Sequence, residues 1–478
     1  MEKELDQVRA RKEKLEKLKG MGVNPYPYSF KRTAYSTEIK ENYEEFEDKK
    51  VKVCGRIKTR RLHGKAGFVH IEDDKGEIQI YFKYDTLREK YSIVKLLDLG
   101  DFIGVEGKVF RTKTGEITVW AEEITLLSKA LHPPPEKWHG IKDVETRYRQ
   151  RYLDLMSNKE IRGLFRRRAE IIKGIREFLD ERGFVEVETP ILQPVYGGAF
   201  ATPFTTYYIK LKKNFYLRIS DELYLKRLII GGYERVYEIG KNFRNEGIDR
   251  THNPEFTAME VYQAYADYRD MMELFEDMVI YLARKIYGKE EIQYDGKTIS
   301  LKKPWRRISY FEALKKYTGE EWRGLSFEET KKLAEKLGLE VEEKRIKGKI
   351  LESVFERFVE PELIEPAFVV DYPADITPLA KNKRDDPGLV ERFEAFIGGV
   401  EVANAYSELN DPEEQERRFE EQLKLKEREE YDRDFVRALY YGMPPTGGLG
   451  VGIDRLVMIL LNASSIREVI LFPQLREE

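Results

Sequence analysis

Residues 235–268 read RVYEIGKNFRNEGIDRTHNPEFTAMEVYQAYADY, and this stretch decides the fold as a strand, a polar loop and a second strand. On the first strand, Arg244 and Glu246 lie two residues apart and are expected on one face. Such a hairpin presents a cation, an aromatic ring and carboxylates together, a set that suits phosphate, a purine and a cationic group. Alternation alone would group side chains in any half-buried hairpin, but ordinary hairpins turn apolar groups inward. The second strand instead has a polar face that carries Phe256, Ala258, Glu260 and Tyr262.

A second polar strand lies in residues 391–411, ERFEAFIGGVEVANAYSELND. Glu394 and Glu401 are candidates for binding Mg²⁺, which takes one or two carboxylates together with substrate phosphates. Glu401 has the opposite parity from Glu408, so both reach one cleft only if a bulge or a strong twist intervenes, and the sequence does not show one. After the glycine pair 398–399, one face of the strand carries Asn404, Tyr406 and Glu408, and the face expected to pack carries Ala403, Ala405 and Ser407.

A glycine-rich strand and a helix are expected in residues 447–461, GGLGVGIDRLVMILL. Gly450 and Gly452 have the GxG spacing of a dinucleotide fingerprint, but Arg455 replaces the third glycine and fewer than 30 residues follow. No βαβ unit fits there, so the Rossmann interpretation fails. A glycine-rich strand allows a flat ligand to lie close to the backbone, and Arg455 opens a helix where it can meet phosphate or cover a ring. The sequence also has no GxxxxGK[ST] phosphate loop.

The N-terminal part has a different pattern. Five short segments between Val51 and about residue 127 alternate with a period of two, which suits a small barrel of the OB type. Its first strand is basic and acid-free from Val51 to Lys65, and Phe68 follows. This arrangement suits single-stranded bases, although a solvated edge strand with a core phenylalanine explains it equally well. Residues 2–19 predict a charged helix, either docked by a thin apolar stripe or serving as a basic arm for nucleic acid.

Composition limits the classes of protein. The 478 residues suggest about three units, and 84 Lys+Arg against 87 Asp+Glu give a net charge of −3, so any nucleic-acid contact must come from a local patch. A single cysteine, Cys54, excludes an internal disulfide and a multi-cysteine zinc site. No apolar stretch approaches the roughly 20 residues of a membrane helix, and the charged N-terminus is no secretory signal, so a cytoplasmic location is expected.

Proline and charge patterns predict the domain organisation. The proline-rich stretch LHPPPEKWHG, a helix over residues 159–182 and the strand-like GFVEVETPIL mark the entry into the larger domain. The expected division is an N-terminal helix and lead-in (1–48), an OB-fold domain (49–130), a linker (131–155) and a larger α+β domain (156–478). A Glu- and Lys-rich helical insertion is expected at about 300–360.

Taken together, three segments resemble the three motifs of class II aminoacyl-tRNA synthetases: GFVEVETPIL, FRNEGIDRTHNPEFTAMEVY and GLGVGIDR, in the right order. An OB domain before the catalytic domain is similar to the aspartate, asparagine and lysine subgroup. Within it, DELYLKRLIIGGYERVYEIGKNFRNEG and NAYSELNDPEEQ resemble lysyl-tRNA synthetases, over nearly the whole chain.

The resemblance implies an α+β class II fold: an antiparallel catalytic sheet flanked by helices, preceded by an all-β OB barrel and dimerised through motif 1. It implies a lysine–tRNA ligase that uses ATP, L-lysine, tRNA(Lys) and Mg²⁺. Arg244 would hold the α-phosphate and the lysine carboxylate, Phe256 would stack under adenine, and Arg455 would close over its other side. Glu246 and His252 would also touch ATP, and Glu394 and Glu401 would hold Mg²⁺, Glu394 beside the nucleotide. Implied lysine-binding residues are Gly198, Glu222, Glu260, Tyr262, Asn404, Tyr406 and Glu408, and implied anticodon-binding residues are Arg60, Phe68, Gln79 and Glu116.

One position departs from some bacterial relatives, which have an arginine directly before the motif 2 histidine. In this sequence Thr251 occupies that position and Arg250 is one place earlier, which leaves open which arginine, if either, reaches the γ-phosphate.

Two rival hypotheses remain. One is an aspartyl- or asparaginyl-tRNA synthetase, which would need a cation in the side-chain pocket, and the other is an inert RNA-binding or scaffold protein derived from a synthetase. A relative that lysylates proteins is disfavoured, because such relatives lack the OB domain.

Overall fold

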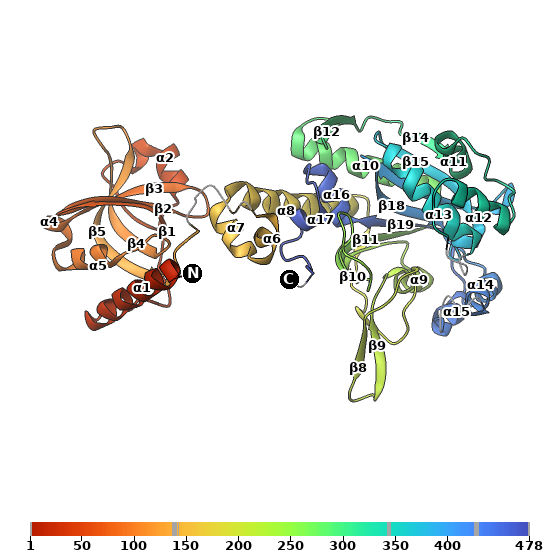
Figure 1. The fold of residues 1–478 in the computed structure, drawn as a ribbon, viewed down its shortest axis with the longest axis horizontal. Coiled ribbons are helices and arrows are strands. Elements are labelled where there is room, and N and C mark those ends of the chain that lie inside the picture. Colours follow the sequence, from red (N-terminus) through yellow and green to blue (C-terminus); the bar gives the residue numbers. More distant parts are fainter. Residues whose placement is uncertain (1, 136–140, 142, 342–345, 425–429, 477–478) are drawn as a thin grey trace. The chain divides into compact units, whose positions relative to one another are not determined.

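The computed structural model describes residues 2–135, 141, 143–341, 346–424 and 430–476. Residues 136–140 and 142 of the expected linker, and residues 342–345 of the expected insertion, lie outside the described part. The chain divides into two compact units, Met1–Ile141 and Lys142–Glu478 (Figure 1). In the described residues, no helix combines the length and the apolar character needed to cross a membrane.

The first unit is the expected closed five-stranded barrel. Val51, Val53 and Ile57 on its first strand are buried, and the alternating residues 52, 54 and 56 are more exposed, as a period of two requires. Gly107 permits the strands to approach closely, because an added Cβ would lie 2.0 Å from the Trp120 carbonyl oxygen. The strands close in the order β1-β2-β3-β5-β4 and are β1 (Lys50–His63), β2 (Ala66–Glu72), β3 (Glu77–Lys83), β4 (Phe102–Arg111) and β5 (Ile117–Ser128).

Helix α1 (Glu2–Gly20) docks on this unit through part of its expected stripe. Leu15 and Leu18 are buried, whereas Leu5 is 63% exposed. Arg11 is also buried, and its Nη1 donates to the carbonyl oxygens of Leu99 (3.0 Å) and two further residues. These contacts confirm that the C-terminal half of α1 docks on the barrel unit. A role in binding nucleic acid for the basic residues of α1 other than Arg11 stays a prediction. The remaining helices of the unit are short: α2 (Ser36–Glu41), α3 (Tyr43–Phe46), α4 (Tyr84–Leu87) and α5 (Tyr91–Leu96).

The second unit contains a large sheet with strand order β14-β15-β17-β18-β19-β11-β10-β6, and β16 pairs with β17. Its central pairings are antiparallel, as expected, while the edge pairs β14–β15 and β10–β6 are parallel. The strands are β6 (Val185–Glu186), β10 (Arg235–Phe243), β11 (Glu255–Ala264), β14 (Arg306–Ser309), β15 (Ala367–Pro373), β16 (Asn382–Lys383), β17 (Asp386–Ile397), β18 (Val400–Ser407) and β19 (Thr446–Gly452). Smaller sheets are formed by β7 (Leu192–Gln193), β8 (Thr205–Tyr208) and β9 (Lys213–Leu217), and by β12 (Glu291–Tyr294) and β13 (Lys297–Ser300).

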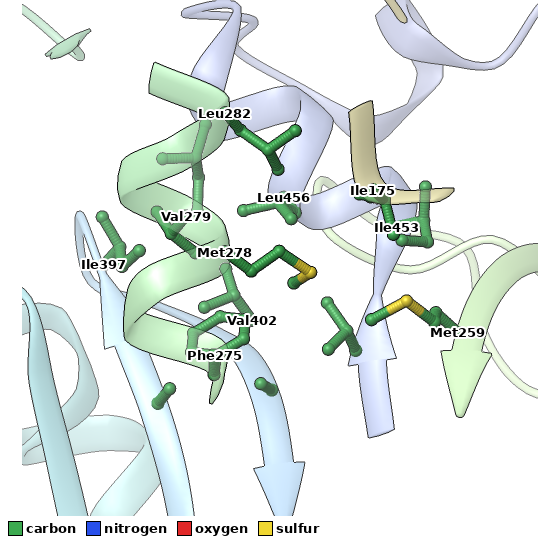
Figure 2. Packing of buried hydrophobic residues seen from close by; sticks show 14 of the residues in the cluster. Ile175, Met259, Phe275, Met278, Val279, Leu282, Ile397, Val402, Ile453 and Leu456 are labelled. Carbon is green, nitrogen blue, oxygen red and sulfur yellow. The ribbon is translucent and has the colours of Figure 1, made fainter. Parts of the chain in front are cut away.

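Helices α10 (Tyr268–Tyr287) and α16 (Ile453–Leu460) cover one face of this sheet and build the core. In Figure 2, Phe275, Met278 and Leu282 of α10 point toward α16 and β18. The small residues Ala403 and Ala405 of β18 are buried here, which confirms their packing face. The opposite face of the sheet is left for polar side chains.

The other helices of the second unit are α6 (Val144–Arg149), α7 (Arg151–Ser157), α8 (Lys159–Asp180), α9 (Glu222–Ile230), α11 (Tyr310–Thr318), α12 (Phe327–Lys336), α13 (Lys347–Phe358), α14 (Pro412–Lys424), α15 (Arg433–Leu439) and α17 (Ile466–Val469).

Three local expectations were wrong. Strand β10 ends at Phe243, so Arg244 and Glu246 lie in the following loop and not on one strand face. GFVEVETPIL is not one continuous strand: only Val185 and Glu186 pair with β10, as β6, and its last residue, Leu192, begins β7 in another sheet. The segment 300–360 is not purely helical, since its strand β14 pairs with β15 and extends the main sheet before the helices begin.

Phe275 offers a test of this core, because it is fully buried and its ring packs edge-on against Trp305 at 5.8 Å. We expect Phe275→Ala to lower the free energy of unfolding by about 3–5 kcal/mol through lost burial and a residual cavity. Phe472→Ala is the matched control, because Phe472 is 67% exposed and the same truncation there should change stability by less than about 0.5 kcal/mol. Denaturant unfolding measures both, and equal losses would contradict this packing.

Candidate active site

A cavity of about 430 Å³ opens on the polar face of the large sheet. All candidate residues of the larger domain line it, although they come from strands, helices and loops far apart in the sequence. They are Gly198, Glu222, Arg244, Glu246, His252, Phe256, Glu260, Tyr262, Glu394, Glu401, Asn404, Tyr406, Glu408 and Arg455.

Strand register explains why these side chains meet. Gly450 pairs with Asn404 on one side and with Glu260 on the other, and Asn404 in turn pairs with Glu394. The next row pairs Gly448 with Tyr406 and Tyr262 in the same way. Since paired residues of an antiparallel sheet share a face, two rows of polar side chains cross the pocket.

The glycines of β19 make room within these rows. A Cβ added to Gly448 would lie 1.9 Å from Glu408 Oε1, and one added to Gly450 would lie 3.4 Å from Glu260 Oε1. The expected close approach to the backbone is therefore made at these two positions by the protein's own carboxylates.

One end of the pocket gathers three carboxylates, of which Glu222 and Glu408 are buried and share one cation. Lys226 of α9 is fully buried, and its Nζ pairs with Glu222 Oε1 at 2.5 Å and with Glu408 Oε2. Tyr406 donates to Glu222 Oε2 (3.1 Å), and Tyr262 donates to Glu260 Oε2 (3.0 Å).

Burial controls the protonation of this cluster. It raises the pKa of Glu408 to about 8, against the opposing effect of Lys226 and with the help of Glu222. Burial and the nearby Asp221 and Glu222 also raise the pKa of Glu260 well above its usual range. These carboxylates are short of positive charge, so the pocket favours a cationic ligand.

Glycine 198 holds a loop against the same end of the pocket. Its φ is +86°, and an added Cβ would lie 2.8 Å from Ser220 Oγ and 3.2 Å from Glu222 Cβ. The loop thus approaches the start of α9 more closely than any other residue type allows.

A bulge resolves the parity of Glu401. Ala395 pairs with Ala403, but the next pair is Phe396 with Glu401, so Val402 is the extra residue on β18. A bulge turns the following side chain back to the same face. Glu401 and Asn404 therefore both line the pocket. The sequence analysis required a bulge or a strong twist for this arrangement, but the sequence did not show where it lies.

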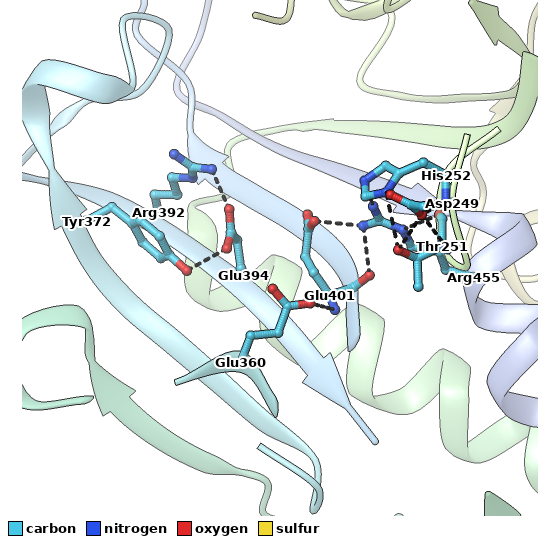
Figure 3. Close-up of polar contacts among 9 residues, drawn as sticks. All are labelled: Asp249, Thr251, His252, Glu360, Tyr372, Arg392, Glu394, Glu401 and Arg455. Atoms are coloured by element: carbon cyan, nitrogen blue, oxygen red, sulfur yellow. Dashed lines mark hydrogen bonds and ion pairs between the residues drawn. The ribbon is translucent and has the colours of Figure 1, made fainter. Parts of the chain in front are cut away.

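Arg455 is fixed at the other end of the pocket (Figure 3). Its Nη1 donates to Glu401 Oε2 (2.8 Å), and its Nη2 donates to His252 Nε2 (2.7 Å). Because His252 Nε2 accepts this bond, its Nδ1 carries the proton and donates to Asp249 (2.8 Å). The guanidinium is thus held in place by two segments of the chain, strand β18 and the loop at residues 251–252.

Glu394 belongs to a second network in Figure 3. Arg392 Nη2 donates to its Oε1 at 2.5 Å, and Tyr372 donates to its Oε2 at 2.7 Å. Burial, opposed by Arg392 and reinforced by Glu401, raises the pKa of Glu394 to about 7. Burial and Glu401 similarly raise the pKa of Glu360 to about 8. This end of the pocket thus has an excess of carboxylates, although the described residues contain no cluster of three or more potential metal ligands.

Arg244 extends into the pocket from the loop after β10. Its backbone N–H donates to the Pro254 carbonyl oxygen (2.9 Å), and its guanidinium lies 5.1 Å from the centre of the Phe256 ring. Its buried Nε has no hydrogen-bond partner among the described residues, as expected of a group that awaits a ligand. Arg250, in contrast, donates to Ser464 and Tyr294 and does not line the pocket.

Sequence reasoning missed two buried cations. Lys226 lies four residues after Glu222 in a helix, a spacing that usually marks a solvated pair. Arg392 lies two residues before Glu394 on β17. It orients Glu394, and it also orients Asn404 by donating a hydrogen bond to the Asn404 Oδ1 at 3.0 Å. Its position in the strand could have indicated this role.

On the barrel, three of the four candidate residues share one outer face. Phe68 packs on Tyr81 (4.8 Å between ring centres), and Tyr81 packs on Trp120. Nearby, Glu116 accepts hydrogen bonds from Gln79 and His70, both at 2.7 Å. Arg60 is set apart, because it pairs with the inward-facing Val69 and donates to the Lys95 carbonyl oxygen, while Arg61 stands opposite Phe68.

Comparison with known proteins gives consistent results for both units. Residues 143–476 match the family described as tRNA synthetases class II (D, K and N), and residues 51–127 match the OB-fold nucleic acid binding domain. Among curated proteins, the lysine–tRNA ligase of Thermoanaerobacter pseudethanolicus is 54% identical, covering 98% of this chain and 96% of its own. Those of Carboxydothermus hydrogenoformans (52%; 98% of each chain) and Moorella thermoacetica (51%; 100% and 99%) are similarly close.

The glycine strand can be tested directly. We expect Gly448→Ala to displace the Glu408 carboxylate and to destabilise the fold by about 1–3 kcal/mol, because its Cβ would meet two buried side chains. Gly247→Ala is the matched control, since Gly247 lines the same pocket with no atom within 4 Å of an added Cβ. Thermal unfolding measures the stability of both variants. If Gly448→Ala were as stable as the wild type, the close approach of Glu408 to β19 would be contradicted.

Proposed function

The chain belongs to the class II tRNA synthetases of the D, K and N group, and we propose that it works as a lysine–tRNA ligase through the pocket described above. It activates L-lysine with ATP to give lysyl-adenylate and transfers the lysyl group to the 3′ end of tRNA. The observation that carries the assignment of the pocket is that Glu222, Glu260 and Glu408 line one end of it, while Lys226 pairs with only two of them, Glu222 and Glu408.

The carboxylate end suits L-lysine. We assign Glu260 and Glu408, with Tyr262, to the ε-ammonium group, because acids attract this group and repel an aspartate side chain. Oε1 of Glu408 is buried without a hydrogen-bond partner among the described residues, which supports a ligand there. Glu222 and the loop at Gly198 are assigned to the α-ammonium group, and Asn404 and Tyr406 complete the lysine pocket.

The opposite end suits ATP. Arg244 is assigned to the α-phosphate and the lysine carboxylate, Phe256 to one face of adenine and Arg455 to the other face. The Glu246 and His252 side chains line the same region and are assigned to nucleotide contacts.

The donor set fits Mg²⁺ beside the nucleotide. Glu394 and Glu401 supply two carboxylates from neighbouring strands, and oxygen ligands of this kind together with substrate phosphates are what Mg²⁺ prefers. The raised pKa of Glu394 supports an added cation, since the negative charge of Glu401 contributes to it. When bound, the ion neutralises phosphate charge.

Catalysis is positioning and charge stabilisation, with no nucleophile supplied by the protein. The lysine carboxylate oxygen attacks the α-phosphorus of ATP, and the bond to pyrophosphate breaks. A ribose hydroxyl at the 3′ end of tRNA then attacks the activated carbonyl and releases AMP. Arg244 aligns carboxylate and phosphate in the first step, and Arg455, already held by Glu401 and His252, needs little reorganisation.

The rival hypotheses fit the pocket less well. An aspartyl or asparaginyl enzyme needs a free cation facing the substrate side chain, but Lys226 is fully buried and engaged by Glu222 and Glu408. An inert scaffold would not need the oriented Arg244, Arg455 and carboxylates. The barrel that protein-lysylating relatives lack is present.

We further propose that the barrel binds the anticodon of tRNA(Lys). The stacked Phe68, Tyr81 and Trp120 give a platform for bases. Gln79 and Glu116 offer polar contacts beside this platform, and Arg60 supplies positive charge from the adjoining strand.

A homodimer through motif 1 is proposed as well, because Val185, Ile191 and Leu192 are apolar and more than 40% exposed. The cytoplasm, which supplies ATP and tRNA, is the proposed location.

The role of Arg244 can be tested by ATP–pyrophosphate exchange. We expect Arg244→Ala to reduce lysine-dependent exchange by at least about 10²-fold, because one preorganised donor to the transition state is lost. Its fold should remain intact by circular dichroism. Arg235→Ala, at the exposed far end of β10, is the matched control and should leave exchange unchanged. Full exchange in Arg244→Ala would overturn the assignment of this residue.

The barrel platform can be tested separately. We expect Phe68→Ala to raise the KM for tRNA(Lys) in aminoacylation by roughly tenfold, since loss of one base stack costs about 1–3 kcal/mol. Lysine-dependent exchange, which needs no tRNA, should not change. Phe102→Ala, a truncation on β4, should leave the KM for tRNA unaltered, and an equal effect of both variants would argue against the platform.

A further inference from the structure

Lys226 is the one residue in the carboxylate cluster to which the proposed function gives no role. It lies on α9, one turn after Glu222, and none of it is exposed. Its Nζ contacts both Glu222 and Glu408 and lies 6.0 Å from the Tyr406 ring and 5.8 Å from the Phe435 ring. It does not itself line the cavity, so it cannot contact a substrate directly.

Counting charges gives Lys226 a role. Glu222, Glu260 and Glu408 line the cavity and carry three negative charges when ionised. Asp221 is also buried, but it does not line the cavity, and Arg218 opposes its charge. L-lysine brings two ammonium groups, while its carboxylate is assigned to Arg244. Two ammonium groups balance two of the three carboxylates, and the third needs a cation from the protein. Buried charge without compensation is costly, so the balance matters.

The geometry agrees with this count. Lys226 binds Oε2 of Glu408 and Oε1 of Glu222, whereas Oε1 of Glu408 is left without a hydrogen-bond partner among the described residues. The second oxygen of Glu222 accepts a hydrogen bond from the Tyr406 hydroxyl, and the second oxygen of Glu408 is left for a ligand in the cavity.

We propose that Lys226 is a positioning residue for substrate lysine, which orients Glu222 and Glu408 and cancels the one negative charge that the two ammonium groups of the substrate leave unbalanced. The inference rests on the proposed function and deepens it, because it makes recognition of a dibasic amino acid depend on a cation that the substrate never touches.

Removal of this charge should alter the pH dependence of lysine use. The groups that face Glu408 are Lys226 and Glu222 on α9, Glu260 and Tyr262 on β11, and Tyr406 on β18. Only Lys226 among them is cationic, and it opposes the burial that raises the pKa of Glu408 to about 8. An ionised Glu408 binds ammonium, so kcat/KM for lysine in the wild type should rise with pH and level off near 8. Without Lys226 the pKa of Glu408 rises further, and kcat/KM should still be increasing above that pH.

The test is lysine-dependent ATP–pyrophosphate exchange with Lys226→Met, which keeps the approximate length and removes the charge. At pH 7 we expect the KM for lysine to rise by at least about tenfold, the effect of one pKa unit at a fixed pH, with the KM for ATP unchanged. Lys226→Arg should recover part of the loss. Arg227→Met is the matched control, because it breaks an ion pair of the same helix with Asp432 (2.7 Å) outside the pocket and should leave the KM and its pH profile unaltered.

A double-variant cycle keeps the inference falsifiable if Lys226→Met folds poorly. In the Glu408→Gln background only two carboxylates remain, so Lys226→Met should raise the KM for lysine much less than it does in the wild type. An equal rise in both backgrounds, or an unchanged pH profile in Lys226→Met, would overturn the role of Lys226. Absence of lysine-dependent exchange in the wild type would instead overturn the proposed function, which separates the two failures.

Discussion

The gathering of Glu222, Glu260 and Glu408 at one end of the pocket, with Lys226 buried between two of them, is the constraint on which the rest of the catalytic unit depends. Carboxylates removed from water bind ammonium tightly, but their mutual repulsion and desolvation oppose folding. Lys226 and the hydroxyls of Tyr262 and Tyr406 offset part of this cost, and the raised pKa values of Glu260 and Glu408 reflect what is left. In the proposed function, this residual excess of negative charge favours a cationic substrate.

The sheet accommodates these groups by separating its two faces. One face carries the small residues of β18 and the apolar residues of β19, which pack under α10 and α16. The other face alternates large polar side chains with the glycines of β19, so that Glu408 and Glu260 can lie flat against the central strand. One bulge at Val402 shifts the pairing of β17 and β18 by one residue and so brings Glu401 to this polar face.

At the proposed nucleotide end, the protein's own side chains hold most of the charged groups in place. Arg455 is fixed by Glu401 and His252, and Glu394 by Arg392 and Tyr372. Arg244 differs, because its buried Nε has no hydrogen-bond partner among the described residues, which agrees with its proposed contact with substrate. Preorganised donors of this kind need little rearrangement during the reaction, which suits a mechanism based on positioning.

The sequence by itself determined the elements and most of the pocket. Alternation placed Glu260 with Tyr262, and Asn404 with Tyr406, because a period of two is a local property of the strand. It also separated the barrel from the larger unit, and resemblance assigned the loop residues that alternation could not. Only the tertiary structure decided that β10 stops before Arg244, that a bulge lies at Val402 and that Lys226 sits between Glu222 and Glu408. These features depend on which strand pairs with which and on where α9 packs, and such contacts join residues far apart in the chain, so no local pattern specifies them.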